Sequence, residues 1–230
     1  MKIKDEEFQT LLACFINEKG EKQQHGFSEK FMDIVIKVIH DKKDRFQLRT
    51  LVHIIWALAK IDFNNERIIG TLNDLKEYPR LQIGLEGMYQ KSQCILLWTY
   101  SRDARLLDKE FLTKVIDSML TFQGQVFQLD NFDILLILQA ANHLERSEHV
   151  QGDHIFTTKI CQLTQMLDTF VLKNLENMNL HEFTTSLIFY LNPSHHDVCS
   201  PQLRRALLHK MNSSVSQLNE YQLHIFKKLA

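Results

Sequence analysis

The sequence predicts an all-α fold, specifically an α-solenoid of about five helical-hairpin repeats with a period near 40 residues. Apolar residues recur at the i, i+3, i+4 and i+7 spacing of an amphipathic helix along almost the whole chain. Only 7 Gly and 3 Pro occur in 230 residues, too few turn formers for an all-β fold. Similar apolar runs also return at intervals of 40 to 42 residues, as stacked helical hairpins require.

Start and stop signals delimit the expected helices in chain order. Ser28 precedes a stripe over 31–39, Asn64 or Asn65 precedes a helix that ends before Pro79, and Asp108 and Ser200 are further N-cap candidates. Ser200 is followed by Pro201, which suits a first helical turn. The remaining apolar stripes predict helices over 8–15, 51–62, 93–103, 131–144, 154–175, 180–192 and 218–229.

The two tryptophans set the repeat register. When Trp56 is placed over Trp98, the offset is 42 residues, and HIIWALAK matches ILLWTYSR in pattern. Phe15 lies 41 residues before Trp56, Leu138 lies 40 after Trp98, and the next interval, to Tyr190, is 52. We therefore expect a single helical-repeat domain over 1–230, with units near 1–43, 44–84, 85–125, 126–178 and 179–214 and a terminal helix at 216–230. An irregular helical bundle is the alternative.

The stretch IIWALAKI, residues 54–61, resembles the first helix of octotricopeptide repeats and of the related FAST-kinase-like, RAP-associated helical repeats of organelles. The residues from Ile55 to Lys60 match their Leu-Trp-Ala-Leu-Ala-Lys core, and Ile95 to Trp98 match its first half. The resemblance implies a non-enzymatic protein without a cofactor, mitochondrial in location, that handles RNA or belongs to a ribonucleoprotein such as the mitochondrial ribosome.

The amino-acid composition favours a different function from the RNA binding that the resemblance implies. Lys and Arg number 27 against 28 Asp and Glu, and a near-neutral chain gains little from counterion release on RNA. The rival hypothesis is a protein-binding scaffold or accessory subunit of a large mitochondrial assembly. The N-terminus has no signal-peptide pattern, so a cytoplasmic location is the alternative if the resemblance fails. No apolar run approaches the roughly 20 residues of a membrane-spanning helix.

The repeat register also nominates binding residues. Arg49 overlays Lys91 and Lys60 overlays Arg102, so cations are expected along one edge of adjacent repeats. The next offset adds Asn131 and Asn142, and such a ladder could follow phosphates or read bases. The two tryptophans could stack on bases, but a Trp flanked by aliphatic residues within a repeat core is more typical of packing, and we interpret both as core residues. The expected repeat core is Trp56, Leu58, Ala59, Leu97, Trp98 and Leu138.

No enzyme or metal site is expected. The sequence contains no GxSxG, GxxxxGK[ST], HExxH or GxGxxG pattern. The four cysteines lie far apart and form no CxxC pair, which favours reduced thiols over a disulfide framework or a zinc site.

Overall fold

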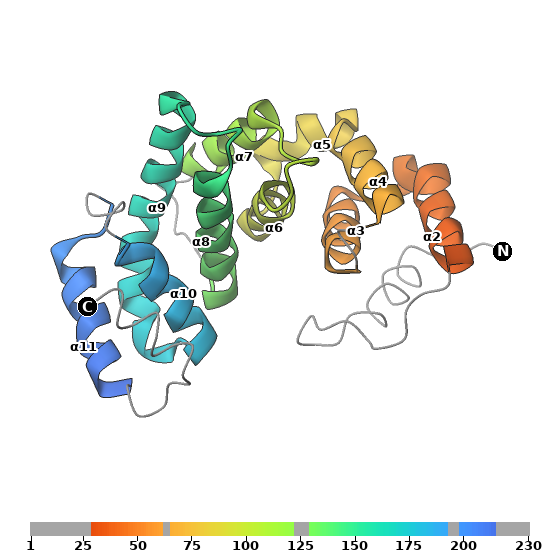
Figure 1. Cartoon of the computed structure of the whole chain (residues 1–230). Helices are drawn as coiled ribbons and strands as arrows, with labels where there is room; N and C mark the ends of the chain where they lie inside the picture. The colour runs from red at the N-terminus through yellow and green to blue at the C-terminus, as the bar shows by residue number, and fades with distance from the viewer. Residues whose placement is uncertain (1–28, 62–64, 122–128, 193–197, 215–230) are drawn as a thin grey trace. The chain divides into compact units, whose positions relative to one another are not determined.

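Helices make up all the regular secondary structure in the part of the chain that the structure describes. The computed structural model describes residues 29–61, 65–121, 129–192 and 198–214, and within these ranges it contains no strand. The all-α prediction is therefore confirmed (Figure 1). The helices expected at 8–15 and 216–230 lie outside the described residues. No helix within the described ranges is long and apolar enough to cross a membrane.

The helices are joined by short connections. In chain order they are α2 Glu29–Lys42, α3 Leu48–Ile61, α4 Glu66–Lys76, α5 Pro79–Gly84, α6 Gln90–Ser101, α7 Lys109–Thr121, α8 Asn131–Arg146, α9 His154–Asn174, α10 Leu180–Tyr190 and α11 Pro201–Ser214. Short 3-10 turns, Lys43–Arg45, Leu85–Gly87 and Leu175–Asn177, precede α3, α6 and α10.

Side-chain caps explain where several helices begin. The Asn65 side chain accepts a hydrogen bond from the Arg67 N–H at 3.0 Å, so Asn65 caps α4. Asp108 accepts from the Phe111 N–H, and Ser200 accepts from the Leu203 N–H, as the sequence led us to expect. Capping boxes open α8 (Asp130 with Asp133) and α10 (Asn179 with Glu182).

The chain forms two compact units, residues 1–115 and 116–230, and the division falls within α7. In the first unit, α3 packs against α4, α5 and α6, and α4 also contacts α5. The buried Tyr100 hydroxyl on α6 donates a 2.8 Å hydrogen bond to the backbone carbonyl of Leu72 on α4. Its ring meets the Phe111 ring edge-on at 5.1 Å. These contacts join α4, α6 and α7 around one apolar core.

The second unit uses the same kind of tyrosine contact. There α8 packs against α9 and α10, and α9 packs against α11. The buried Tyr190 hydroxyl on α10 donates a 2.9 Å hydrogen bond to the Thr164 carbonyl on α9. At the start of α11, the Ser200 N–H donates to the Asp168 carboxylate at 3.1 Å. In both units a buried tyrosine thus joins one helix to the backbone of a helix that precedes it in the chain.

Candidate cationic and aromatic site on α3 and α6

The solvent-facing side of α3 carries only cationic and aromatic side chains after its first residue. Most of α3 is buried, and the side chains beyond Leu48 that stay open to solvent are Arg49, His53, Trp56 and Lys60. Their spacing of i, i+4, i+7 and i+11 places them on one face of the helix. The α3 sequence, LRTLVHIIWALAKI, contains no carboxylate. The open face of α3 is therefore basic although the chain as a whole is near neutral.

Helix α6 contributes cations at its two ends. Residues from Ser92 to Ser101 are all buried, whereas Lys91 at the start and Arg102 just beyond the last residue are exposed. The α6 sequence, QKSQCILLWTYS, also lacks a carboxylate. We use the name α3–α6 stripe for the set Arg49, His53, Trp56, Lys60, Lys91, Trp98 and Arg102.

Lys60 and Arg102 meet at the ring of Trp98. The Lys60 Nζ lies 4.6 Å from the centre of the Trp98 ring, and the Arg102 Cζ lies 4.3 Å from the same centre. Lys60 is also 5.7 Å from the centre of the Trp56 ring. These distances are within the range of cation–π attraction. The sequence register that aligned Lys60 with Arg102 therefore identified two cations that the packing of α3 on α6 brings together.

Burial and mutual repulsion both act on these cations. Burial, followed by the charge of Arg102, lowers the pKa of Lys60. Partial desolvation also lowers the pKa of Arg102, although the residue as a whole remains exposed to solvent. On α3, burial and then the charge of Arg49 lower the pKa of His53. All three shifts mean that the site disfavours positive charge in its present state, and a bound anion would reverse that preference.

Lys60, unlike Lys76 and Lys159, has no carboxylate partner among the described residues. Lys76 is buried and lies 3.4 Å from the Asp108 carboxylate, and Lys159 forms an ion pair with Asp117. Such pairing is the usual way in which a protein tolerates a desolvated charge. For Lys60 the structure instead supplies two indole rings and a second cation.

Trp56 differs from the expectation that it is a core residue. Trp98 is 3% exposed, and the other expected core residues, Leu58, Ala59, Leu97 and Leu138, are buried as well. Trp56 is only half-buried, because α4, α5 and α6 cover the other faces of α3 and leave this one open. Its buried indole Nε1 has no hydrogen-bond acceptor among the described residues.

Arg49 and Lys91 lie in the first turns of α3 and α6, and both side chains are exposed. The two asparagines of the expected ladder belong to the second unit. Asn131 begins α8 and donates to the Asn177 carbonyl at 3.3 Å, while Asn142 lies on the same helix; both side chains are half-buried. The hydrogen bond of Asn131 gives it a structural role at the start of α8.

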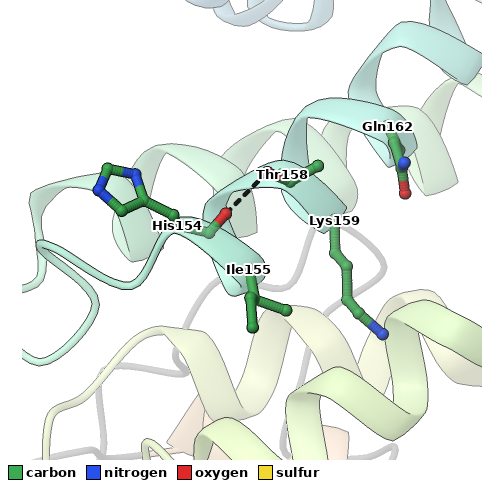
Figure 2. Close-up of a pocket in the computed structure, with 5 residues that line it drawn as sticks. All are labelled: His154, Ile155, Thr158, Lys159 and Gln162. Carbon is green, nitrogen blue, oxygen red and sulfur yellow. Dashed lines mark hydrogen bonds between the residues drawn. The ribbon is translucent and has the colours of Figure 1, made fainter.

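A second surface feature, on α9, was not expected from the sequence. An open pocket of about 320 Å³ is lined by His154, Ile155, Thr158, Lys159 and Gln162. Figure 2 shows Ile155 and Lys159 pointing to the same side of α9. Ile155 is 76% exposed, and Ile83, elsewhere on the surface, is 82% exposed. The apolar spacing of α9 is consistent with this exposure, because Ile155 lies outside the buried stripe and its neighbours at i+3, i+4 and i+7 are Thr158, Lys159 and Gln162.

No group of three His, Cys, Asp or Glu side chains within the described ranges could hold a metal ion. Cys94, Cys161 and Cys199 are free thiols, and Cys14 lies outside those ranges. Comparisons with family models, with curated proteins and with solved structures find no match to this chain. The α3–α6 stripe and the α9 pocket are therefore interpreted from their own chemistry.

Proposed function

We propose that this chain is a non-enzymatic helical-repeat protein that binds RNA along the α3–α6 stripe. The observation that carries the proposal is the meeting of Lys60 and Arg102 over Trp98, where Lys60 has no described carboxylate partner. A phosphate group placed between these cations would supply the missing negative charge. Arg and Lys side chains are the usual phosphate contacts of nucleic-acid-binding proteins.

The local distribution of charge allows RNA binding although the composition of the whole chain is near neutral. The chain has nearly equal numbers of acidic and basic residues, but α3 and α6 contain no carboxylate. A local basic strip is sufficient to release counterions from a nucleic acid, because only the charges near the phosphates contribute. The neutral balance of the whole chain is therefore compatible with RNA binding by this one face.

The solenoid arrangement is part of the same proposal. Its support is that α3 packs on both α4 and α6, and that equivalent tryptophans, Trp56 and Trp98, lie near one cation where α3 meets α6. The tyrosine-to-carbonyl contact also recurs in both units. Residence in a mitochondrial ribonucleoprotein follows only from the resemblance of residues 54–61 to organellar repeats.

The test is a salt titration of binding to a fluorescently labelled single-stranded RNA, followed by anisotropy. We expect log Kd to change with log salt at a slope of about 0.7 per phosphate neutralised. The double variant Lys60→Glu/Arg102→Glu should weaken binding at least tenfold and reduce that slope. The matched control is Lys37→Glu/Lys173→Glu, which makes the same change of charge at exposed positions on α2 and α9. Salt-independent binding, or equal losses in both double variants, would overturn the proposal.

Ile155 supports a second candidate function, a scaffold that binds a protein partner through an apolar contact. An exposed isoleucine beside an open pocket is the kind of anchor that a partner side chain would cover. The test is sedimentation of the chain in cell extract treated with ribonuclease. The scaffold function requires a large particle that resists ribonuclease and that Ile155→Asp releases to small fractions, whereas Lys60→Glu/Arg102→Glu leaves it intact.

A further inference from the structure

Trp56 and Trp98 occupy equivalent positions in the sequence register but have different surroundings. Trp98 is almost fully buried, and both Lys60 and Arg102 lie against its ring. Trp56 is half-buried on the open face of α3, and its only described cation, Lys60, lies closer to Trp98 than to Trp56. The Trp56 indole is therefore the more accessible of the two rings.

The neighbours of Trp56 on the open face are cationic or aromatic in both directions. His53 precedes it by one turn and Lys60 follows it by one turn, and Arg49 lies two turns before it. From Arg49 to Lys60 the helix rises roughly 16 Å. This length matches roughly four to five stacked nucleotides of one strand. An aromatic ring in the middle of such a row is placed where a base would lie between flanking phosphates.

We propose that Trp56 stacks on an unpaired base of the bound RNA, while Arg49 on one side and Lys60 with Arg102 on the other hold the neighbouring phosphates. This inference rests on the proposed function and narrows its ligand to a single strand. Bases in a duplex are stacked on one another and cannot present a face to an indole, whereas unpaired bases stack on aromatic side chains without sequence preference.

The open ring favours RNA over an acidic protein segment. A glutamate-rich peptide would satisfy Lys60 and Arg102, but it offers no aromatic plane to Trp56. Stacking also explains why a large indole occupies a solvent-facing position between charged side chains. RNA can therefore contact both Trp56 and the cations, whereas an acidic peptide can pair only with the cations.

Intrinsic fluorescence tests the inference directly, because the chain contains only two tryptophans. In Trp98→Phe the emission comes from Trp56, and in Trp56→Phe it comes from Trp98. A saturating single-stranded oligoribonucleotide of ten nucleotides should quench the emission of Trp98→Phe by more than a third. It should leave the emission of Trp56→Phe nearly unchanged. Quenching of the reverse pattern would overturn the inference.

Affinity measurements separate stacking from charge. Trp56→Leu should bind the single-stranded decamer about tenfold more weakly than the unsubstituted chain, and Trp56→Phe should restore most of that loss, because phenylalanine retains a ring. An abasic decamer of the same charge should bind the unsubstituted chain and Trp56→Leu equally. Circular dichroism and the unfolding temperature establish that Trp56→Leu is folded.

The measurements distinguish a failure of the proposed function from a failure of the inference about Trp56. If the unsubstituted chain shows no salt-dependent binding to the decamer, the proposed function fails and the inference fails with it. If binding is salt-dependent and is lost in Lys60→Glu/Arg102→Glu, but Trp56→Leu binds as the unsubstituted chain does, only the inference fails. Equal affinity for the decamer, for its duplex and for poly-glutamate would also refute stacking, since charge alone would then account for binding.

Discussion

The ammonium of Lys60 lies between two indoles, 4.6 Å from the centre of the Trp98 ring and 5.7 Å from that of Trp56. Burial and Arg102 lower the pKa of this lysine, so its charge opposes folding, while cation–π attraction of about 0.5–1 kcal/mol acts in the other direction. We expect Lys60→Met to keep the free energy of unfolding within about 1 kcal/mol of the original value, because methionine fills similar apolar space. Urea denaturation measures this; a loss of stability above about 2 kcal/mol would contradict our account of the site.

His53 should make the stability depend on pH. Burial and Arg49 lower its pKa below the ordinary value of 6.5. As the pH falls from 7 through the interval between the ordinary and the lowered pKa, the unfolded chain takes up a proton that the folded chain does not. The free energy of unfolding should therefore fall over this interval.

Replacing His53 tests that relation. His53→Gln should flatten the pH profile between pH 7 and 5, and Arg49→Gln should flatten it in part, because one of the two causes of the shift is removed. Thermal unfolding at half-unit pH steps provides the measurement. If His53→Gln retains the full acid loss, another group is responsible for it.

Gly84 and Gly70 should respond to alanine in opposite ways. A Cβ at Gly84 would overlap the side chain of Leu48, whereas a Cβ at Gly70 would meet nothing within 4 Å. We expect Gly84→Ala to cost about 1–3 kcal/mol through overpacking. Gly70→Ala, in the middle of α4, should gain about 0.5–1 kcal/mol through helix propensity.

A double-mutant cycle connects the Gly84 effect to its cause. Leu48→Ala removes the atoms that the new Cβ would strike, so the cost of Gly84→Ala should be much smaller in that background. Chemical denaturation of the four proteins gives the coupling energy. Strict additivity would show that Leu48 is not the obstacle.

The two buried tyrosines should contribute similarly to stability. Tyr100 donates to the Leu72 carbonyl and Tyr190 donates to the Thr164 carbonyl, and burial raises the pKa of both hydroxyls, which therefore remain donors at neutral pH. Tyr100→Phe and Tyr190→Phe should each cost about 1 kcal/mol, the net worth of one hydrogen bond. Tyr89→Phe is the control, because that ring is 77% exposed. No loss at either buried position would mean that the hydroxyl is not needed there.

The sequence predicted helix starts well where a side chain caps the backbone. Asp108 and Ser200 act as caps because their side-chain oxygens accept a hydrogen bond from the N–H three residues later. Both could be predicted because each is a capping residue type placed directly before an amphipathic stretch. It did not predict α5, because Pro79 was interpreted as the end of a helical segment. Pro79 instead occupies the first turn of a new helix, where its missing N–H costs nothing.

Only part of the candidate site could be predicted from the sequence. The 42-residue register identified Lys60 and Arg102 as related positions, and both lie against Trp98. The same register treated Trp56 and Trp98 as equivalent, whereas Trp56 is half-buried and Trp98 is 3% exposed. Apolar spacing does distinguish the exposed Ile155 from a buried residue of α9 such as Ile160, since five residues turn the helix by about 140° and Ile155 lies off the buried stripe.

The tyrosine contacts span short stretches of chain, 28 residues from Tyr100 to Leu72 and 26 from Tyr190 to Thr164. A ribosome adds roughly 5–20 residues per second, so each contact becomes possible within seconds of the synthesis of its helices. Packing between α3, α4 and α6 does not depend on residues made much later. The face that carries Trp56 and Lys60 can thus assemble on the nascent chain before α10 and α11 have been translated.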